Sequence, residues 1–332
     1  MNILFITQSG PDLPSVRFRV LPFVEHARKE GHTVDWKRIP KAFHKRLAFF
    51  LTIPRNTIVI LQKKMLTGFQ LALLKNRRSA LVFDFDDALW TSHPSVPLGP
   101  RRDRTDKRNA ILLKKTCLKA DLVVAGNNYL RDYIKSFNQN IEIIPTPLDT
   151  DKYLPPETRD NNKAPIIGWM GTSCNLFFLP DVLKSLSANV TPSRISIISD
   201  KPLPKHIAGL AQFEKWSGEN EVKQLQNMDI GLMPLTDDDY TKGKCGFKLL
   251  QYMACGAVPL ASNVGFNTEI IEHGVNGFLI NEHDEWAKYV ELLSNDSDLR
   301  HSMAKKARET VVEKFSLDPL AKKLWARLEK IS

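Results

Sequence analysis

The sequence of 332 residues lacks the features that mark several large protein classes. It has only 4 cysteines, none in a CxxC pair, so neither a zinc-finger pattern nor a disulfide framework is present, which fits a reducing cytoplasm. No apolar run approaches the roughly 20 residues of a membrane span. The first residues read as a strand with no basic n-region and no cleavage site, so we expect no signal peptide. The composition, 42% hydrophobic and 25% charged, excludes collagen-like, low-complexity and fully disordered chains.

Positive charge is concentrated in the first half. Residues 1–150 hold 25 Lys and Arg against 13 Asp and Glu, whereas the rest of the chain holds 22 against 24. Between residues 41 and 78 the basic residues alternate with apolar ones, as in segments that lie at an anionic membrane surface. No zinc finger, RRM signature or basic leucine zipper accompanies this charge, so we expect no nucleic-acid partner. A solvated basic face that aids solubility is the alternative.

Hydrophobic patterning predicts two α/β halves. Continuous apolar runs are typical of parallel strands covered on both faces. In the first half we expect strands at 2–7, 32–36, 57–61, 80–83, 122–125 and 141–144, with a helix at 18–29. A Pro- and Asp-rich linker at 146–165 precedes strands at 166–170, 194–199, 230–234 and 258–261, and helices at 176–186, 222–226 and 247–254. The predicted domains are 1–155 and 156–315, with a C-terminal helix in 316–332 that crosses back to the first domain.

The strongest motif covers residues 243–262, where glycines and lysines precede a predicted helix that ends at Gly256. Lys244, Lys248, Gln251 and Cys255 recur at i, i+4, i+7 and i+11, so we expect them on one helix face. The first backbone N–H groups and the helix dipole attract anions, and the two lysines would add charge for a diphosphate. A solvated lysine pair at a helix start is the structural alternative.

This segment resembles the signature of family 4 glycosyltransferases, which are retaining enzymes of the GT-B fold. Residues 252–262, Tyr-Met-Ala-Cys-Gly-Ala-Val-Pro-Leu-Ala-Ser, are similar to the end of the family's Glu-x7-Glu motif. Residues 229–235, 265–271 and 274–279 are similar to the strand before it and the turns after it. The resemblance is specific over roughly 229–280 and collinear over most of the chain.

The departures from the family pattern concern the donor site. Gln251 stands where the second glutamate would hold the nucleotide ribose, and Gly243 stands where the first glutamate would be. The family's Arg and Lys after the first strand of the second domain are absent. Gly171, Thr172 and Ser173 occupy that turn and offer backbone and hydroxyl donors. The sequence resembles a subgroup with Gly-Trp-x-Gly and Lys-x3-Lys-x2-Gln spacing, in which Lys244 and Lys248 would supply the missing charge.

Two arginines follow the first predicted strand. Arg17 and Arg19 lie in a loop that opens at the carboxyl end of that strand, where doubly wound sheets bind ligands. Guanidinium groups at this place suit an anionic donor or acceptor group. An arginine pair that faces solvent is the alternative.

An acidic turn follows the strand predicted at 80–83. Asp84 and Asp86 form an Asp-x-Asp pair that resembles the haloacid-dehalogenase phosphatase motif, with Asp84 as nucleophile, Asp86 as acid and magnesium as cofactor. In the glycosyltransferase interpretation, Asp84 and Asp87 instead bind acceptor hydroxyls or stabilise the oxocarbenium-like charge. A structural acidic turn is the third reading.

Together these features predict an α/β protein of GT-B fold, with two Rossmann-like domains facing a cleft. The resemblance implies metal-independent transfer of a hexose from a UDP- or GDP-sugar, with retention and no cofactor. The acceptor is expected to be anionic or lipid-linked, in a cytoplasmic protein in peripheral contact with the inner face of a membrane. A non-catalytic sugar-nucleotide binder and the magnesium-dependent phosphatase are the alternatives.

Overall fold

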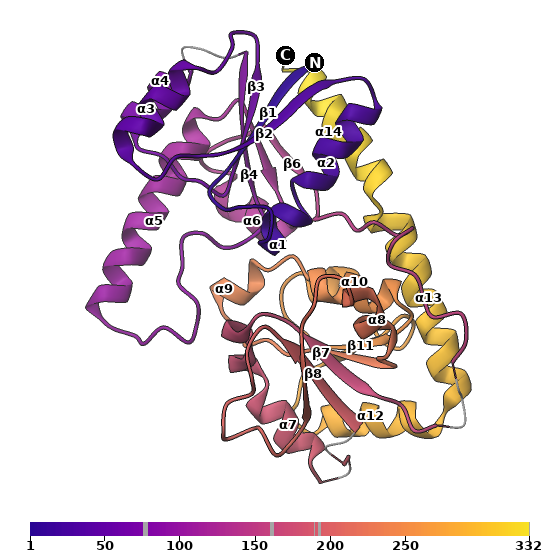
Figure 1. Ribbon diagram of the computed structural model, residues 1–332. Helices are drawn as coiled ribbons and strands as arrows, with labels where there is room; N and C mark the ends of the chain where they lie inside the picture. Colours follow the sequence, from indigo (N-terminus) through magenta and orange to yellow (C-terminus); the bar gives the residue numbers. More distant parts are fainter. Residues whose placement is uncertain (76–78, 160–162, 189, 192–193, 332) are drawn as a thin grey trace. The chain divides into compact units, whose positions relative to one another are not determined.

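The computed structural model describes residues 1–75, 79–159, 163–188, 190–191 and 194–331 (Figure 1). The predicted linker at 146–165 and the basic stretch at 41–78 therefore extend in part outside the described residues. The chain divides into two compact units. Unit 1 comprises residues 1–147, 238–245 and 317–332, and unit 2 comprises 148–237 and 246–316. The boundary at 147 is eight residues before the predicted one, and 238–245 joins unit 1 although the sequence assigns it to the second half.

Unit 1 is built on a sheet of six parallel strands in the order β2-β1-β3-β4-β5-β6. Its strands are β1 (Asn2–Thr7), β2 (Thr33–Arg38), β3 (Ile58–Gln62), β4 (Ala80–Phe85), β5 (Leu122–Ala125) and β6 (Ile141–Ile143). Strands β3, β4 and β5 are buried along their whole length, because helices cover both faces of a parallel sheet. The strand order reverses between β1 and β3, so the carboxyl ends of these strands mark the switch point at which such sheets bind ligands.

Eight helices belong to unit 1 within the described residues. They are α1 (Pro14–Arg17), α2 (Leu21–Lys29), α3 (Phe43–Leu51), α4 (Gly68–Lys75), α5 (Pro100–Lys119), α6 (Asn128–Ile134), α9 (Asp239–Lys242) and α14 (Leu317–Glu329). The C-terminal α14 packs beside α2, as Figure 1 shows. Trp325 on α14 donates from Nε1 to Nδ1 of His26 at 3.1 Å and packs edge-on against Phe23. The last helix thereby completes the first core.

Unit 2 repeats the architecture with a second six-stranded parallel sheet, in the order β12-β11-β10-β7-β8-β9. Its strands are β7 (Ile167–Met170), β8 (Ile195–Ser199), β9 (Gln212–Lys215), β10 (Ile230–Met233), β11 (Val258–Ser262) and β12 (Phe278–Ile280). The switch point of this sheet lies between β7 and β10. Strand β9 is exposed throughout and lies at the sheet edge, so it carries no apolar run that the sequence analysis could detect.

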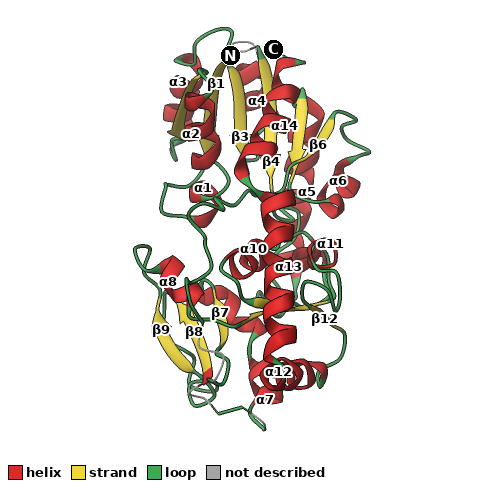
Figure 2. Ribbon diagram, turned by 90° about the vertical axis from the view of Figure 1, so that its right-hand side faces the viewer, coloured by secondary structure: helices red, strands yellow, loops and turns green. Residues whose placement is uncertain are grey.

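The helices of unit 2 enclose the second core. They are the 3-10 helix η1 (Ser173–Phe178) and the α-helices α7 (Pro180–Leu186), α8 (Glu221–Gln226), α10 (Phe247–Ala254), α11 (Asn267–Ile270), α12 (Glu285–Asn295) and α13 (Ser297–Phe315). Helices α7 and α12 lie side by side (Figure 2). The helix predicted at 176–186 is divided into η1 and α7 at Pro180, because proline fits the first turn of a helix but not its interior.

Candidate functional site

A buried ion pair lies near the switch point of unit 1. Arg19 donates from Nε to Oδ2 of Asp84 at 2.9 Å and from Nη2 to Oδ1 at 2.8 Å, and from Nη1 to Oγ1 of Thr146 at 3.2 Å. Arg19 is only 1% exposed. Burial opposes its charge, but the carboxylates of Asp84 and Asp86 outweigh burial and raise its pKa. The structure therefore gives Arg19 a structural partner in place of the expected anionic ligand.

Lys63 forms a second ionic contact, with the two carboxylates that follow Asp84 and Phe85 in the chain. Its Nζ lies 2.6 Å from Oδ1 of Asp86 and 2.5 Å from Oδ2 of Asp87. Burial works against the charged form, but these two carboxylates raise the pKa of Lys63. Lys63 follows β3 with a φ of 54°, in the left-handed region that non-glycine residues rarely adopt. Such a conformation persists only where its surroundings hold it, and here the ionic contacts with Asp86 and Asp87 do so.

The two carboxylates predicted to work together lie in different surroundings. Both oxygens of Asp84 accept from Arg19, which leaves no free carboxylate oxygen for the nucleophilic role of the phosphatase reading. The Asp87 side chain is 38% exposed. Burial would raise its pKa, but Lys63 and Lys244 outweigh burial and lower it. Asp87 is thus an ionised, accessible carboxylate, whereas Asp84 is part of the framework.

The segment 238–245 packs against these loops within unit 1. Asn127 caps α6 and donates from Nδ2 to the carbonyl oxygen of Lys244 at 3.1 Å. Cys245 donates from Sγ to the carbonyl oxygen of Asp86 at 3.2 Å, and Tyr129 donates from its hydroxyl to Asp239 at 2.8 Å. The Lys244 ammonium lies 4.7 Å from the centre of the Tyr240 ring. Backbone and side-chain contacts therefore fix the position of Lys244.

Gly243 is required by this packing. A Cβ at this position would lie 2.6 Å from Cβ of Ala88 and 2.7 Å from its backbone nitrogen. A backbone atom cannot move aside as a flexible side chain can. The structure thus explains why glycine stands where the resembled family has its first glutamate.

Lys248 lies at the switch point of unit 2. It is in the first turn of α10, and its Nζ lies 5.3 Å from the centre of the Trp169 ring. A Cβ on Gly171, directly after β7, would lie 2.6 Å from Cε of Lys248. The lysine stem therefore passes directly over Gly171, and glycine leaves room for it. This places an ammonium group where doubly wound sheets bind phosphates.

The predicted polar face of the 247–254 helix needs correction. Helix α10 begins at Phe247 after Gly246, which has a φ of 58°, so Lys244 precedes the helix and belongs to unit 1. Cys255 is completely buried and Gln251 is 6% exposed. Of the four residues expected on one face, Lys248 is the one in α10 that is partly exposed. The left-handed glycine breaks the i, i+4 relation on which the prediction depended.

Gln251 contacts a carboxylate that sequence reasoning missed. Its Nε2 donates to Oε1 of Glu221 at 3.2 Å. Glu221 also accepts from Nε1 of Trp216 at 2.8 Å and from the hydroxyl of Tyr153, and it is 3% exposed. No sequence signal marked Glu221, because it lies 30 residues from Gln251 and in a different helix.

Two of the three residues predicted as donors in the turn after β7 donate to partners within unit 2. The Gly171 N–H donates to the carbonyl oxygen of Ile198 at 3.0 Å. Ser173 donates from its backbone N–H and its hydroxyl to Asp200, at 2.6 and 3.2 Å. The hydroxyl of Thr172 lies 3.2 Å from Sγ of Cys174 and accepts from Asn175 at 2.9 Å. The turn therefore shapes the space beneath Lys248, and its Gly171 and Ser173 N–H groups are not free for a phosphate.

Two further features bear on the predicted chemistry. Among the described residues, no cluster of three or more His, Cys, Asp or Glu side chains could hold a metal ion. Within the same part of the chain, no helix has both the length and the apolar character needed to cross a bilayer.

The two six-stranded parallel sheets with their helices form the GT-B glycosyltransferase fold, as solved structures show. Anabaena HepE in complex with UDP and glucose superposes with a TM-score of 0.73 at 15% identity, over 99% of this chain and 100% of that one. Sucrose-phosphate synthase from Thermosynechococcus elongatus reaches a TM-score of 0.79 at 13% identity, over 100% of both chains. The predicted fold class is confirmed.

Two sequence comparisons found local similarity to glycosyltransferases. Residues 210–310 match the family model of group 1 glycosyl transferases. A stretch of 77 residues is 36% identical to N-acetyl-alpha-D-glucosaminyl L-malate synthase of Bacillus anthracis. That stretch is 22% of this chain and 20% of the relative, so the likeness is local. In sequence, the likeness to glycosyltransferases is therefore confined to part of the second half of the chain, whereas the likeness of fold covers the whole chain.

Proposed function

We propose that this protein is a retaining glycosyltransferase that moves a sugar from a nucleotide diphosphate to an anionic or lipid-linked glycan acceptor. The observation that carries the proposal is the position of Lys248. It extends over Gly171 at the switch point of unit 2, inside the segment that matches the group 1 family model. A cation at this place suits a diphosphate leaving group.

The donor is proposed to be a UDP-sugar, with a GDP-sugar as the alternative. Support comes from the solved structures of similar fold, since HepE structures contain UDP, UDP with glucose, and UDP-glucose. Gln251 is proposed to hold the ribose. Because its Nε2 donates to Glu221, its Oε1 is the atom that would accept from a ribose hydroxyl. Lys244, which the sequence analysis expected beside Lys248, is not part of this proposal, because Gly246 ends the helical spacing and Lys244 belongs to unit 1.

The proposed reaction requires no group other than the substrates and the chain's own residues. The bond between the anomeric carbon and the phosphate oxygen breaks, and its electron pair leaves with the nucleoside diphosphate. Lys248 stabilises the negative charge that develops on that diphosphate. The acceptor hydroxyl attacks from the same face, and its proton passes to the departing phosphate oxygen. Asp87, an accessible carboxylate, is proposed to orient the acceptor hydroxyl.

The place of action is proposed to be the cytoplasm, with peripheral contact to the inner face of a membrane. The support is the excess of Lys and Arg over Asp and Glu in residues 1–150. A polysaccharide intermediate linked to a lipid would be presented at such a surface.

The central experiment replaces Lys248. A thermal-shift screen with UDP-, GDP- and ADP-sugars first identifies the donor, since a ligand that binds the folded state raises the melting temperature. Lys248→Ala should then reduce donor turnover on the order of 100- to 1000-fold, as for loss of one preorganised electrostatic group. Lys223→Ala, at an exposed lysine on α8, is the matched control and should retain activity. Undiminished turnover in Lys248→Ala would contradict the proposal.

Two further measurements test the remaining parts. Proton NMR of the product should show the anomeric configuration of the donor, and an inverted product would exclude the retaining mechanism. Turnover should persist in excess EDTA, and loss of activity that magnesium restores would overturn metal independence. If donor binds but neither transfer nor hydrolysis occurs, the non-catalytic binder is the better description.

A further inference from the structure

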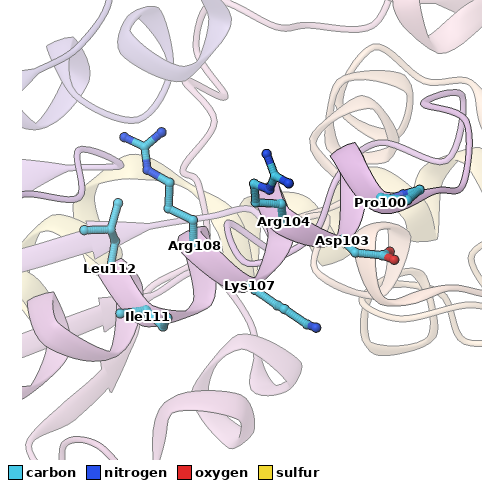
Figure 3. Close-up of a pocket in the computed structure, with 7 residues that line it drawn as sticks. All are labelled: Pro100, Asp103, Arg104, Lys107, Arg108, Ile111 and Leu112. Atoms are coloured by element: carbon cyan, nitrogen blue, oxygen red, sulfur yellow. The ribbon is translucent and has the colours of Figure 1, made fainter.

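A basic hollow runs along α5 in unit 1. It is open, has a volume of about 590 Å³, and is lined by Pro100, Asp103, Arg104, Lys107, Arg108, Ile111 and Leu112 (Figure 3). Figure 3 shows the guanidinium groups of Arg104 and Arg108, one turn apart, on the same side of the helix. Two guanidinium groups in this arrangement match the oxygens of a phosphoryl group.

Within the described residues, no carboxylate forms an ion pair with the cations of this hollow. Within the described ranges, Arg104, Lys107 and Arg108 form neither a hydrogen bond nor an ion pair with another side chain, whereas Arg102 on the same helix pairs with Asp106 at 3.6 Å. One acid, Asp103, lies among the three cations that line the hollow. The net positive charge is therefore available to an anion from outside.

Two further cations from other elements add to this charge. Lys64 follows β3 and Arg46 lies on α3. Lys64 is close enough to Arg46 and to Arg108 of the hollow to interact electrostatically with both. Burial lowers the pKa of Lys64, and the positive charges of Arg46 and Arg108 lower it further. The one hydrogen-bond partner of its Nζ among the described residues is the neutral Oε1 of Gln8, at 3.2 Å. Like charges gathered from α3, α5 and the loop after β3 raise the free energy of the protein without an anion, and a bound anion would lower it.

Apolar side chains accompany the cations on neighbouring helices. Ile111 lines the hollow and is 55% exposed, while Phe69 on α4 is 64% exposed and Phe43 on α3 is 54% exposed. Helix α4 packs against both α3 and α5. Ile111 shares the hollow with Arg104 and Arg108, and an exposed apolar group beside cations suits an amphiphile at a membrane interface, with its phosphate on the cations.

We propose that the α5 hollow binds the phosphoryl headgroup of an amphiphilic lipid, with Arg104 and Arg108 as the main contacts. This inference rests on the proposed function in one respect, namely that the lipid carries the acceptor glycan. Lipid-linked acceptors would then be selected by headgroup chemistry as well as by their sugar.

The test is sedimentation of the full chain with vesicles. Phosphatidylcholine vesicles containing phosphatidic acid should bind the protein, and pure phosphatidylcholine should not. Arg104→Gln/Arg108→Gln should weaken binding about thirtyfold, since each basic residue at an anionic lipid surface contributes on the order of fivefold. Lys115→Gln/Lys119→Gln removes the same charge from exposed positions of α5 outside the hollow and should change binding less than threefold. Equal loss in both double variants, or no loss in the first, would overturn the assignment.

A second arm separates the lipid from free phosphate. Calorimetry with inorganic pyrophosphate measures the affinity of the wild type and of Arg104→Gln/Arg108→Gln for a soluble phosphoryl group. Binding of pyrophosphate through these arginines without any binding of phosphatidic acid vesicles would overturn the lipid and leave a soluble phosphate site.

A third arm keeps this inference distinct from the proposed function. Arg104→Gln/Arg108→Gln should retain the wild-type thermal shift with the donor sugar nucleotide. If the wild type binds no sugar nucleotide but binds phosphatidic acid through the two arginines, the proposed function fails and the lipid site stands. If the sugar nucleotide binds but phosphatidic acid vesicles do not, the lipid site fails and the proposed function stands.

Discussion

Nε2 of Gln251 donates a hydrogen bond to Oε1 of Glu221 at 3.2 Å inside unit 2. Both side chains are more than nine-tenths buried, and Glu221 is at the same time held by Trp216 and Tyr153. A neutral amide at position 251 therefore complements a buried carboxylate at 221. The departure from the resembled family pattern at 251 has a local structural partner.

The first prediction follows from this pair. Gln251→Glu would place a second carboxylate beside Glu221 and should reduce the free energy of unfolding by about 3 kcal/mol at pH 8, the scale of an uncompensated buried charge. The loss should be smaller at pH 5, because repulsion between neighbouring carboxylates favours protonation of the introduced glutamate. Urea denaturation followed by circular dichroism measures both values.

The matched control reverses the two residues. Gln251→Glu/Glu221→Gln restores one carboxylate and one amide and should recover more than half of the lost stability. A single variant as stable as the wild type, or a double variant no better than the single one, would contradict the pairing.

The second prediction concerns Gly243. Gly243→Ala should destabilise the protein by about 1–3 kcal/mol, since overpacking against the fixed backbone of Ala88 forces a displacement. Gly10→Ala is the control, because a Cβ there would meet nothing within 4 Å, and its effect should stay below about 0.5 kcal/mol. Thermal or urea unfolding measures the stability of both variants. Equal stabilities of Gly243→Ala and Gly10→Ala would refute the steric explanation.

The third prediction concerns the pH dependence of Asp87. Burial opposes its ionisation, but Lys63 and Lys244 lower its pKa below the unfolded value. Its contribution is therefore present above the unfolded pKa, about 3.9, and is lost as pH falls through the lower folded pKa. With the side chain 38% exposed, solvent screening limits the contribution to about 1 kcal/mol.

The corresponding measurement compares Asp87→Asn with the wild type. The difference in unfolding free energy should be largest at pH 7 and should shrink below about pH 4. Asp12→Asn, at an exposed carboxylate, serves as the control. A difference that stays constant down to pH 2.5 would show that charge on Asp87 does not stabilise the fold.

The fourth prediction concerns thiol reactivity. Burial raises the pKa of Cys117 to about 12, and burial, assisted by Glu221 and opposed by Arg308 and Arg159, raises that of Cys255 to about 12. Burial also raises the pKa of Cys245 well above its usual value. Because Cys174 is exposed, iodoacetamide at pH 8 should label Cys174 in the native protein and leave the other three unlabelled. Peptide mass mapping identifies the labelled cysteines, and all four cysteines should react in urea.

The sequence by itself determined the repeated α/β pattern. Apolar runs such as 58–61 and 80–83 need cover on both faces, which dictates parallel strands with helices between them. It also located the 243–262 motif, because the glycines and the Ala-Cys-Gly-Ala-Val-Pro turn are local features. The edge strand β9 and the highly charged helix α5 have no such apolar signal, so neither element could be predicted from hydrophobic patterning.

Tertiary structure alone decided which chemical groups remain available. Arg19 is paired with Asp84 across 65 residues and Gln251 with Glu221 across 30, and no spacing rule reaches that far. The left-handed turn at Gly246 removes Lys244 from the helix that Lys248 occupies, and the fold assigns the two lysines to different units. Sequence periodicity describes neighbours along one element, whereas burial and charge pairing depend on which distant elements meet.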